Sequence, residues 1–214
     1  MYSSQNSHRV KFTIMDFNRD SPIPNIDKVG NLIIYIVDEI DKKYRQSLFL
    51  TKLLKLLYLI DETSVKETGA PVTGLNYKVW KMGPVAYDVY VDLMKNNSEQ
   101  LSFFAEAKKL DAKSERELAL IKSVNKFDDS EFSDYEIDLF DRIIKEYGDA
   151  TSELLISRLH EEGTLWSKIV KEQNLEKTFE HKQTSPFSID LSQLVANDPY
   201  KLELFKNAQE SLKL

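Results

Sequence analysis

One apolar segment restricts the fold of this chain more than any other feature. In Phe49–Ile60 only Thr51, Lys52 and Lys55 are polar, so a helix formed here has apolar side chains over most of its circumference. A helix of that kind is stable when other elements enclose it. We therefore expect a buried central helix over about Leu48–Thr68.

Turn-forming residues set the limits of this helix and of the one before it. Gly69 can adopt the left-handed conformation that ends a helix, and Pro71 prevents the helix from resuming. Upstream, Asn25 is a suitable N-cap for a helix that has one apolar side and ends near Tyr44. These signals predict two helices in the first third of the chain.

The middle of the chain combines extended segments with one helix. Alternating apolar and polar residues over Leu75–Met82 predict a strand or extended segment. Gly83 then allows a sharp turn, and Pro84 stands where the first residue of a short amphipathic helix is favoured. Two further apolar runs, Leu101–Ala105 and Leu118–Val124, indicate the strands of a hairpin joined by a charged loop.

Helix signals return in the second half of the chain. Ser133 and Glu136 form a capping box, in which each side chain bonds to the backbone N–H of the other residue. We expect the helix that they open to end at Tyr147. Two more helices follow over about Thr151–Glu162 and Leu165–Asn174, and the remaining tail holds two short helices in our prediction.

The chain shows no repeat, low-complexity segment or linker that would divide it. Residues 1–24 are expected to form an N-terminal strand or extension, because Arg9–Met15 alternates apolar and polar side chains. Residues 25–174 then form the main domain, and residues 175–214 form a C-terminal helical extension packed on it. The predicted fold class is mainly α (α+β), a single helical domain around the buried central helix with a small antiparallel β-sheet or hairpin.

The residue composition excludes several kinds of site. The chain has 214 residues and no cysteine, so disulfides, thiolate metal sites and cysteine nucleophiles are ruled out. Its histidines, His8, His160 and His181, share no metal-ligand spacing, and the sequence has no phosphate-binding glycine loop or catalytic-serine motif. We expect no cofactor, no metal and no enzymatic activity.

Two carboxylates come nearest to an acid–base site. Asp61 and Glu62 directly follow the apolar part of the central helix, where burial would raise the pKa of a carboxyl group. Asp and Glu are rarely buried without a partner. We therefore expect both side chains to face solvent as the helix leaves the core.

Charge and hydropathy indicate a soluble, cytoplasmic protein. The N-terminal segment does not resemble a signal peptide, and the most apolar stretch, 13 residues with two lysines, is too short and too charged to span a bilayer. Nucleic-acid binding depends on neutralising phosphates. The net charge of −6 and the interspersed basic residues disfavour it.

The segment Trp80–Tyr90 combines aromatic residues with a rigid Gly-Pro turn. Trp and Tyr offer large contact areas at a low cost in conformational entropy, so the segment is suited to a preorganised binding surface. Alternatively, Trp80 and Tyr90 pack on the central helix and Gly83-Pro84 only sets the corner. The second role is the commoner one for large aromatic side chains.

A second motif places a histidine at the end of one predicted helix and Trp166 at the start of the next. In the last turn of its helix, His160 suits the negative end of the helix dipole, and its ring can bond exposed carbonyls. We favour this structural role over a catalytic role for His160.

Five motifs follow one another along the chain. They are Lys55-Leu-Leu-Tyr-Leu-Ile60, Thr68-Gly-Ala-Pro71, Trp80-Lys-Met-Gly-Pro-Val85 with Tyr90, Phe132-Ser133 with Glu146-Tyr-Gly148, and Leu159-His160-Glu-Glu with Trp166. In order and spacing they resemble the signature of the Panacea (SocA-like, phage-associated) antitoxin domain family, over about Val29–Lys171. The chain departs from the family pattern at Leu159, where the family commonly has Thr, and in a longer spacer before Trp166.

The resemblance implies a protein-binding module that neutralises a cognate toxin protein by direct contact. In one branch of the family, the module is an adaptor that delivers the toxin to an ATP-dependent protease. The predicted partner-binding residues are Trp80, Lys81, Gly83, Pro84, Tyr87, Tyr90, His160 and Trp166.

Two alternatives belong to other classes of protein. A phage-derived nucleic-acid-binding or regulatory protein would need an exposed basic surface, formed by Lys42–Arg45 with Lys52 and Lys55. An uncharacterised hydrolase, the least favoured alternative, would need an apolar pocket with carboxylates converging near His160.

Overall fold

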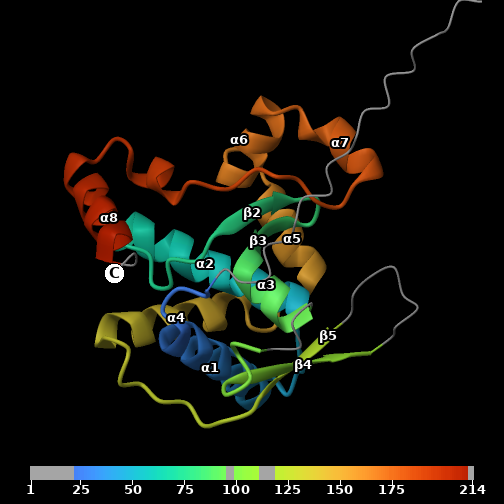
Figure 1. Ribbon diagram of the computed structural model, residues 1–214, viewed down its shortest axis with the longest axis vertical. Helices are drawn as coiled ribbons and strands as arrows, with labels where there is room; N and C mark the ends of the chain where they lie inside the picture. The colour runs from blue at the N-terminus through green and yellow to red at the C-terminus, as the bar shows by residue number, and fades with distance from the viewer. Residues whose placement is uncertain (1–21, 95–98, 111–118, 212–214) are drawn as a thin grey trace, which may run out of the picture.

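The computed structural model describes residues 22–94, 99–110 and 119–211 (Figure 1). The strand predicted over Arg9–Met15 lies outside these residues. The elements in chain order are α1 (Ile26–Tyr44), β1 (Leu48–Phe49), α2 (Leu50–Thr68), β2 (Tyr77–Trp80), β3 (Gly83–Ala86), α3 (Tyr87–Met94), β4 (Ala105–Lys109), β5 (Ala119–Ser123), α4 (Asp134–Tyr147), α5 (Ser152–His160), α6 (Leu165–Glu172), α7 (Leu175–His181), the 3-10 helix η1 (Leu191–Val195) and α8 (Pro199–Ser211). Helices dominate and two small antiparallel sheets complete the structure, which confirms the predicted mainly α fold.

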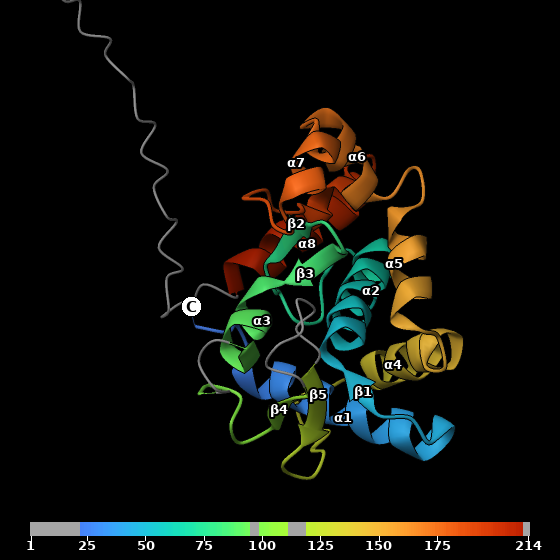
Figure 2. The same cartoon turned by 90° about the vertical axis from the view of Figure 1, so that its right-hand side faces the viewer.

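Helix α2 lies at the centre of the fold, as the two ribbon views show (Figures 1 and 2). Helices α4, α5 and α8, the 3-10 helix η1 and strand β3 all contact it. Leu53, Leu56 and Ile60 are fully buried, and Lys52 and Lys55 are also shielded from solvent. The prediction of an enclosed central helix is confirmed.

The helix ends follow the sequence signals with small shifts. Leu48–Phe49 pairs with β5 as strand β1, so α2 begins at Leu50. Gly69 has a φ of 86° and donates its N–H to the Val65 carbonyl, as expected of a glycine that ends a helix. Asn25 is the N-cap residue of α1, but its left-handed backbone leaves the side chain without a capping bond.

Polar side chains on α2 attach separate segments of the chain to this helix. Lys52 donates from Nζ to the Gly148 carbonyl at 2.5 Å, just after the end of α4. Ser64 donates from Oγ to the Ala70 carbonyl at 2.7 Å. A buried polar group is stable when it has a hydrogen-bond partner, and here the partners are loop carbonyls. The central helix therefore positions the surrounding turns as well as the core.

The strands form two separate antiparallel sheets. Strands β2 and β3 pair as a hairpin with Trp80 opposite Gly83, and the second sheet has the order β1-β5-β4. The predicted hairpin is confirmed in β4 and β5. Strand β4 begins only at Ala105, because Leu101–Phe104 forms a turn.

The predicted role of Pro84 as the first residue of a helix is wrong. Pro84 lies within strand β3, opposite Val79, and α3 begins only at Tyr87. Val79 directs its N–H away from β3, to the Phe187 carbonyl, so this strand pair requires no N–H from Pro84. Proline is therefore tolerated at this position of the hairpin.

The second half of the chain is helical, as expected. Ser133 and Glu136 form the predicted capping box at the start of α4. Three elements, α7, η1 and α8, follow α6 where two short helices were predicted, and η1 and α8 pack on each other and on α2. The division into a main domain and a C-terminal extension remains a prediction.

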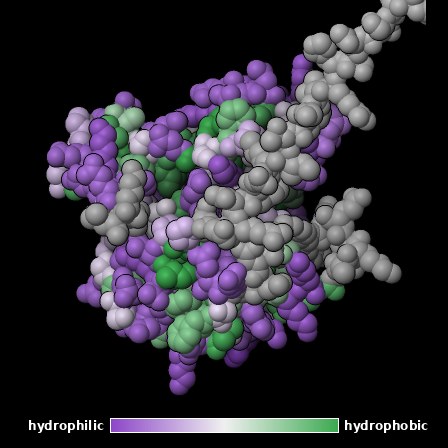
Figure 3. Space-filling model, viewed as in Figure 1, coloured by the Kyte–Doolittle hydropathy of each residue, from purple (hydrophilic) through white to green (hydrophobic). Residues whose placement is uncertain are grey.

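The described helices are all too short or too polar to cross a membrane. The face of the molecule in Figure 3 carries mainly hydrophilic side chains, with hydrophobic residues scattered among them.

Candidate functional site at the hairpin corner

The turn between β2 and β3 and the start of α3 form a corner, defined here as residues 80–90. On β2, Tyr77 points inward and donates from its hydroxyl to the Leu57 carbonyl of α2 at 3.0 Å. Trp80 lies on the opposite face of the strand and is half-buried. Its ring packs edge-to-face on Tyr90 at 4.8 Å and on Tyr87 at 6.4 Å between ring centroids. The three aromatic residues predicted at this corner are therefore in contact.

A buried lysine holds the corner against the central helix. Lys55 is 1% exposed and donates from Nζ to the Pro84 carbonyl at 2.6 Å. In the described ranges, no ion pair joins Lys55 to a carboxylate. Burial therefore lowers the pKa of Lys55 to about 7. From the sequence, Lys55 was expected to be part of a family motif or, in one alternative, of an exposed basic surface. The expectation that Lys55 is exposed is wrong.

His160 lies in the last turn of its helix, as predicted, and is the last residue of α5, which ends two residues before the predicted Glu162. Its ring has a different role from the one expected. The ring stacks on Trp166 with the centroids 3.7 Å apart and the planes nearly parallel. Burial, and then the charge of Lys55, lower the pKa of His160 to about 4. The imidazole is therefore neutral near pH 7 and has no charge to interact with the helix dipole.

Trp166 connects the histidine to the hairpin. Its indole Nε1 donates to the Trp80 carbonyl at 2.8 Å, which ties α6 to the end of β2. The Nε2 atom of His160 is buried and is the one such side-chain nitrogen or oxygen in the described residues without a hydrogen-bond partner. The side-chain nitrogens of Lys55 and His160 thus lie behind the corner, and in the described residues neither is paired with a carboxylate.

Gly83 is the point at which these groups converge. Its φ of 95° is accessible to glycine and strained for other residues. A methyl group on Gly83 would lie 3.4 Å from Nζ of Lys55 and 3.6 Å from Nε2 of His160. The structure therefore brings Gly83 and Pro84, from the hairpin motif, against residues of the first and last motifs.

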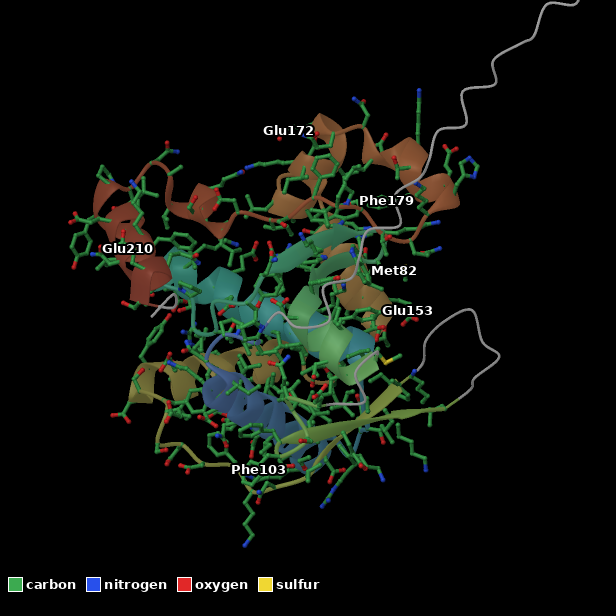
Figure 4. All side chains as sticks on the ribbon, in the orientation of Figure 1. Met82, Phe103, Glu153, Glu172, Phe179 and Glu210 are labelled. Atoms are coloured by element: carbon green, nitrogen blue, oxygen red, sulfur yellow. The ribbon has the colours of Figure 1, made fainter. Side chains whose placement is uncertain are left out.

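The outer rim of the corner is accessible. Met82, at the turn between β2 and β3, is 45% exposed (Figure 4). Lys81 beside it is half-buried, and its backbone N–H bonds to the Gln183 carbonyl at 2.9 Å. The contact of the predicted residues with a partner protein stays a prediction.

The expectation that Asp61 and Glu62 face solvent is wrong. Asp61 is completely buried and Glu62 is 8% exposed. The Asp61 carboxylate accepts hydrogen bonds from the backbone N–H of Val72 and Thr73, from the Thr73 hydroxyl and from the Tyr77 hydroxyl. Burial raises the pKa of Asp61, and these four donors oppose that effect. The carboxylate thus fixes the turn that connects α2 to β2.

The structure contradicts part of the basic surface that the nucleic-acid-binding alternative needed. Lys52 and Lys55 are buried, so they cannot belong to an exposed basic surface. The charge that contributes to the lowered pKa of His160 is that of Lys55, and the hydrolase alternative stays a prediction. Within the described ranges, no cluster of His, Asp and Glu side chains is arranged to hold a metal ion.

These features define a mainly helical domain in which separate motifs meet at one hairpin corner beside an enclosed helix. The family model for the antitoxin SocA-like Panacea domain matches residues 53–167. The chain therefore belongs to the Panacea domain family, as its motifs predicted. No curated protein and no solved structure matches the chain.

Proposed function

We propose that the chain is an antitoxin that neutralises a partner toxin by direct protein–protein contact and has no enzymatic activity of its own. The observation that carries the proposal is the match to the antitoxin-like Panacea family, which spans the residues that assemble the corner. The buried Lys55 and the half-buried His160 support a structural use of these motifs. Lys55 bonds to the Pro84 carbonyl, and His160 stacks on Trp166, which bonds to the Trp80 carbonyl.

The corner has the properties of a preorganised protein-binding surface. The Lys55 and Trp166 hydrogen bonds fix its backbone from two sides, so little conformational freedom remains to be lost on binding. Trp80 and the exposed Met82 supply apolar contact area at its rim. The net charge of −6 would increase the association rate with a basic toxin.

Co-expression with the product of the neighbouring gene tests the proposal. We expect the chain to rescue growth from a toxic neighbour and to co-purify with it. Met82→Asp should weaken the complex at least tenfold, whereas Tyr200→Asp, a control at a 72% exposed position on α8, should not. If no neighbouring product is toxic or bound, the antitoxin assignment loses its support.

A second measurement separates simple binding from delivery to a protease. An adaptor would lower the level of the toxin in cells, and the level would recover when the ATP-dependent protease is removed. A simple binder would leave the level unchanged in both strains. We propose neutralisation by contact as the primary activity, with delivery as a refinement that this comparison decides.

A further inference from the structure

An extended segment of the C-terminal part runs along the outer edge of β2. We call residues 183–189 the strap. The Ile189 N–H donates to the Tyr77 carbonyl at 2.8 Å, and the Phe187 carbonyl accepts from Val79 at 2.9 Å. The Gln183 carbonyl accepts in the same way from Lys81 at 2.9 Å. The strap thus adds an irregular third strand to the hairpin that carries the corner.

Two apolar side chains and several polar contacts attach the strap. Ile189 is buried and Phe187 is half-buried against the core, whereas Thr184, Pro186 and Ser188 are exposed. Apart from Ile189 and Phe187, the attachment consists of polar contacts, such as the bond from the Lys78 Nζ to the Ser188 hydroxyl at 2.8 Å. Exposed polar contacts of this kind add little stability, so the cost of opening the strap is mainly the loss of burial of these two side chains.

The strap can leave β2 without unfolding its neighbours. The segment before it ends in α7, which is anchored by the buried Phe179, and the segment after it begins η1, which is anchored by the buried Leu191. When the strap opens, it therefore becomes a loop that is tethered at both ends. A cavity of about 220 Å³, partly lined by Leu75 and Ile189, adjoins one end of the strap.

The family model covers the edge of β2 but does not cover the strap. Strand β2 lies inside the matched residues 53–167, whereas the strap lies outside them. The edge of β2 offers backbone donors and acceptors that any extended chain can use, and strand addition is a common mode of peptide recognition.

We propose that the outer edge of β2 is a strand-addition site for an extended segment of a partner protein, and that the strap is the resident segment displaced on binding. The proposal rests on the proposed function, since the partner is the toxin. The edge ends at Lys81, next to Met82, so an incoming strand reaches the corner. The position of Ile189 defines an apolar residue as the preferred anchor of that strand.

A reversible disulfide between the strap and β2, called the lock here, provides the test. Lys78 and Ser188 are antiparallel partners, and the bonds on either side of them identify a non-hydrogen-bonded pair. The Cα atoms of such pairs are about 4.5 Å apart, a distance that a disulfide can span. The double variant Lys78→Cys/Ser188→Cys forms one defined disulfide, because the chain has no other cysteine.

The first measurement uses no toxin. The probe is a labelled synthetic peptide with the sequence of residues 182–191, added to the full chain. We expect it to bind Ile189→Asp, whose strap has lost its more deeply buried anchor, at least tenfold more tightly than the wild type, and not to bind the oxidised lock. Equal binding to the lock, or no binding to a folded Ile189→Asp variant, would overturn the proposal.

Hydrogen exchange covers the case in which Ile189→Asp fails to fold. In the wild type, the amides of Val79 and Lys81 should exchange at least tenfold faster than that of Leu56, and the oxidised lock should remove the difference. Equal rates in the unlocked chain would show that the strap does not open.

A toxin that binds the wild type allows a third measurement. The oxidised lock should lose the complex and reductant should restore it; unchanged binding would contradict displacement. Failure of the toxin to bind the wild type contradicts the proposed function alone.

Discussion

The Nζ atom of Lys55 lies 2.6 Å from the carbonyl oxygen of Pro84 and donates a hydrogen bond to it. This contact joins the most enclosed helix of the fold to the strand that forms the corner, across 29 residues of sequence. A charged lysine is costly to bury, because the ammonium group loses its hydration. The contact therefore links the protonation of one side chain to the position of the corner.

Lys55 should make the stability of the protein depend on pH in the alkaline range. Its pKa is about 7 in the folded state, below the ordinary value of 10.5, so the unfolded chain binds the proton more tightly. The contribution of Lys55 to stability is complete above pH 10.5 and is lost as the pH falls to 7. Urea denaturation should therefore give a free energy of unfolding that rises between pH 7 and pH 10.

The variant Lys55→Met should remove most of this rise. It loses one hydrogen bond but no longer buries an amine, so we expect its stability at pH 7 to lie within about 2 kcal/mol of the wild type. Lys177→Met, on the short helix α7, is the control and should keep the wild-type pH dependence. An identical rise in Lys55→Met and the wild type would show that Lys55 is not the group responsible.

Replacing His160 should separate the role of its stacked ring from that of its nitrogen. His160→Phe keeps an aromatic ring on Trp166 and removes a buried nitrogen without a partner, so it should stabilise the fold by about 1 kcal/mol at pH 7. His160→Ala loses the stack and should destabilise it by roughly 2–3 kcal/mol. Thermal or urea denaturation measures both changes.

The same histidine predicts a loss of stability in acid. The pKa of about 4 in the folded state is below the ordinary 6.5, so the stability that His160 supplies is complete above pH 6.5 and is lost as the pH falls to 4. His160→Phe should show a smaller loss over this interval. An NMR signal of the His160 imidazole, identified by its absence in His160→Phe, that titrates near pH 6.5 would contradict this account.

Asp61 should be the most sensitive carboxylate to substitution. Asp61→Asn replaces one of the two oxygens that accept the four hydrogen bonds with an NH₂ group, leaving buried donors without an acceptor. We expect a loss of about 2–4 kcal/mol in urea denaturation. Asp138→Asn, at an exposed ion pair with Arg142, should cost less than about 1 kcal/mol. Equal costs would show that the Asp61 cluster is not important for stability.

Two glycines allow backbone strain to be separated from an effect at the site. Gly83 and Gly163 have φ values of 95° and 89°, so alanine at either position should cost about 1–2 kcal/mol. A methyl on Gly163 meets no atom within 4 Å, whereas a methyl on Gly83 reaches Lys55 and His160. Only Gly83→Ala should therefore shift the NMR signals of His160. A similar shift in Gly163→Ala would contradict convergence at Gly83.

Local signals in the sequence were sufficient where a structure depends on neighbours along the chain. The apolar circumference of α2, the helix-ending Gly69 and the capping box of Ser133 and Glu136 each act within a few residues, and each was predicted correctly. The mainly α fold with a small sheet followed from these signals.

Predictions from the sequence failed where distant segments decide the environment. Asp61 is buried because the turn at Val72 and Thr73 folds back over it, and Pro84 lies in a strand because β2 pairs with it. The exposed basic surface that included Lys55 was wrong because the hairpin supplies a carbonyl for its ammonium group. The position of Lys52 and Lys55 inside an otherwise apolar run is the signal in the sequence that could have indicated buried partners.

The enclosure of α2 determines how the gene can be trimmed. The family match begins at Leu53, inside α2, and ends at Ser167, yet α1, η1 and α8 lie outside it and supply parts of the shared core. A clone restricted to residues 53–167 would expose the faces that these elements cover and would aggregate instead of folding. Chimaeras between relatives should therefore exchange loops on the intact chain, since the family segment is not an autonomous unit.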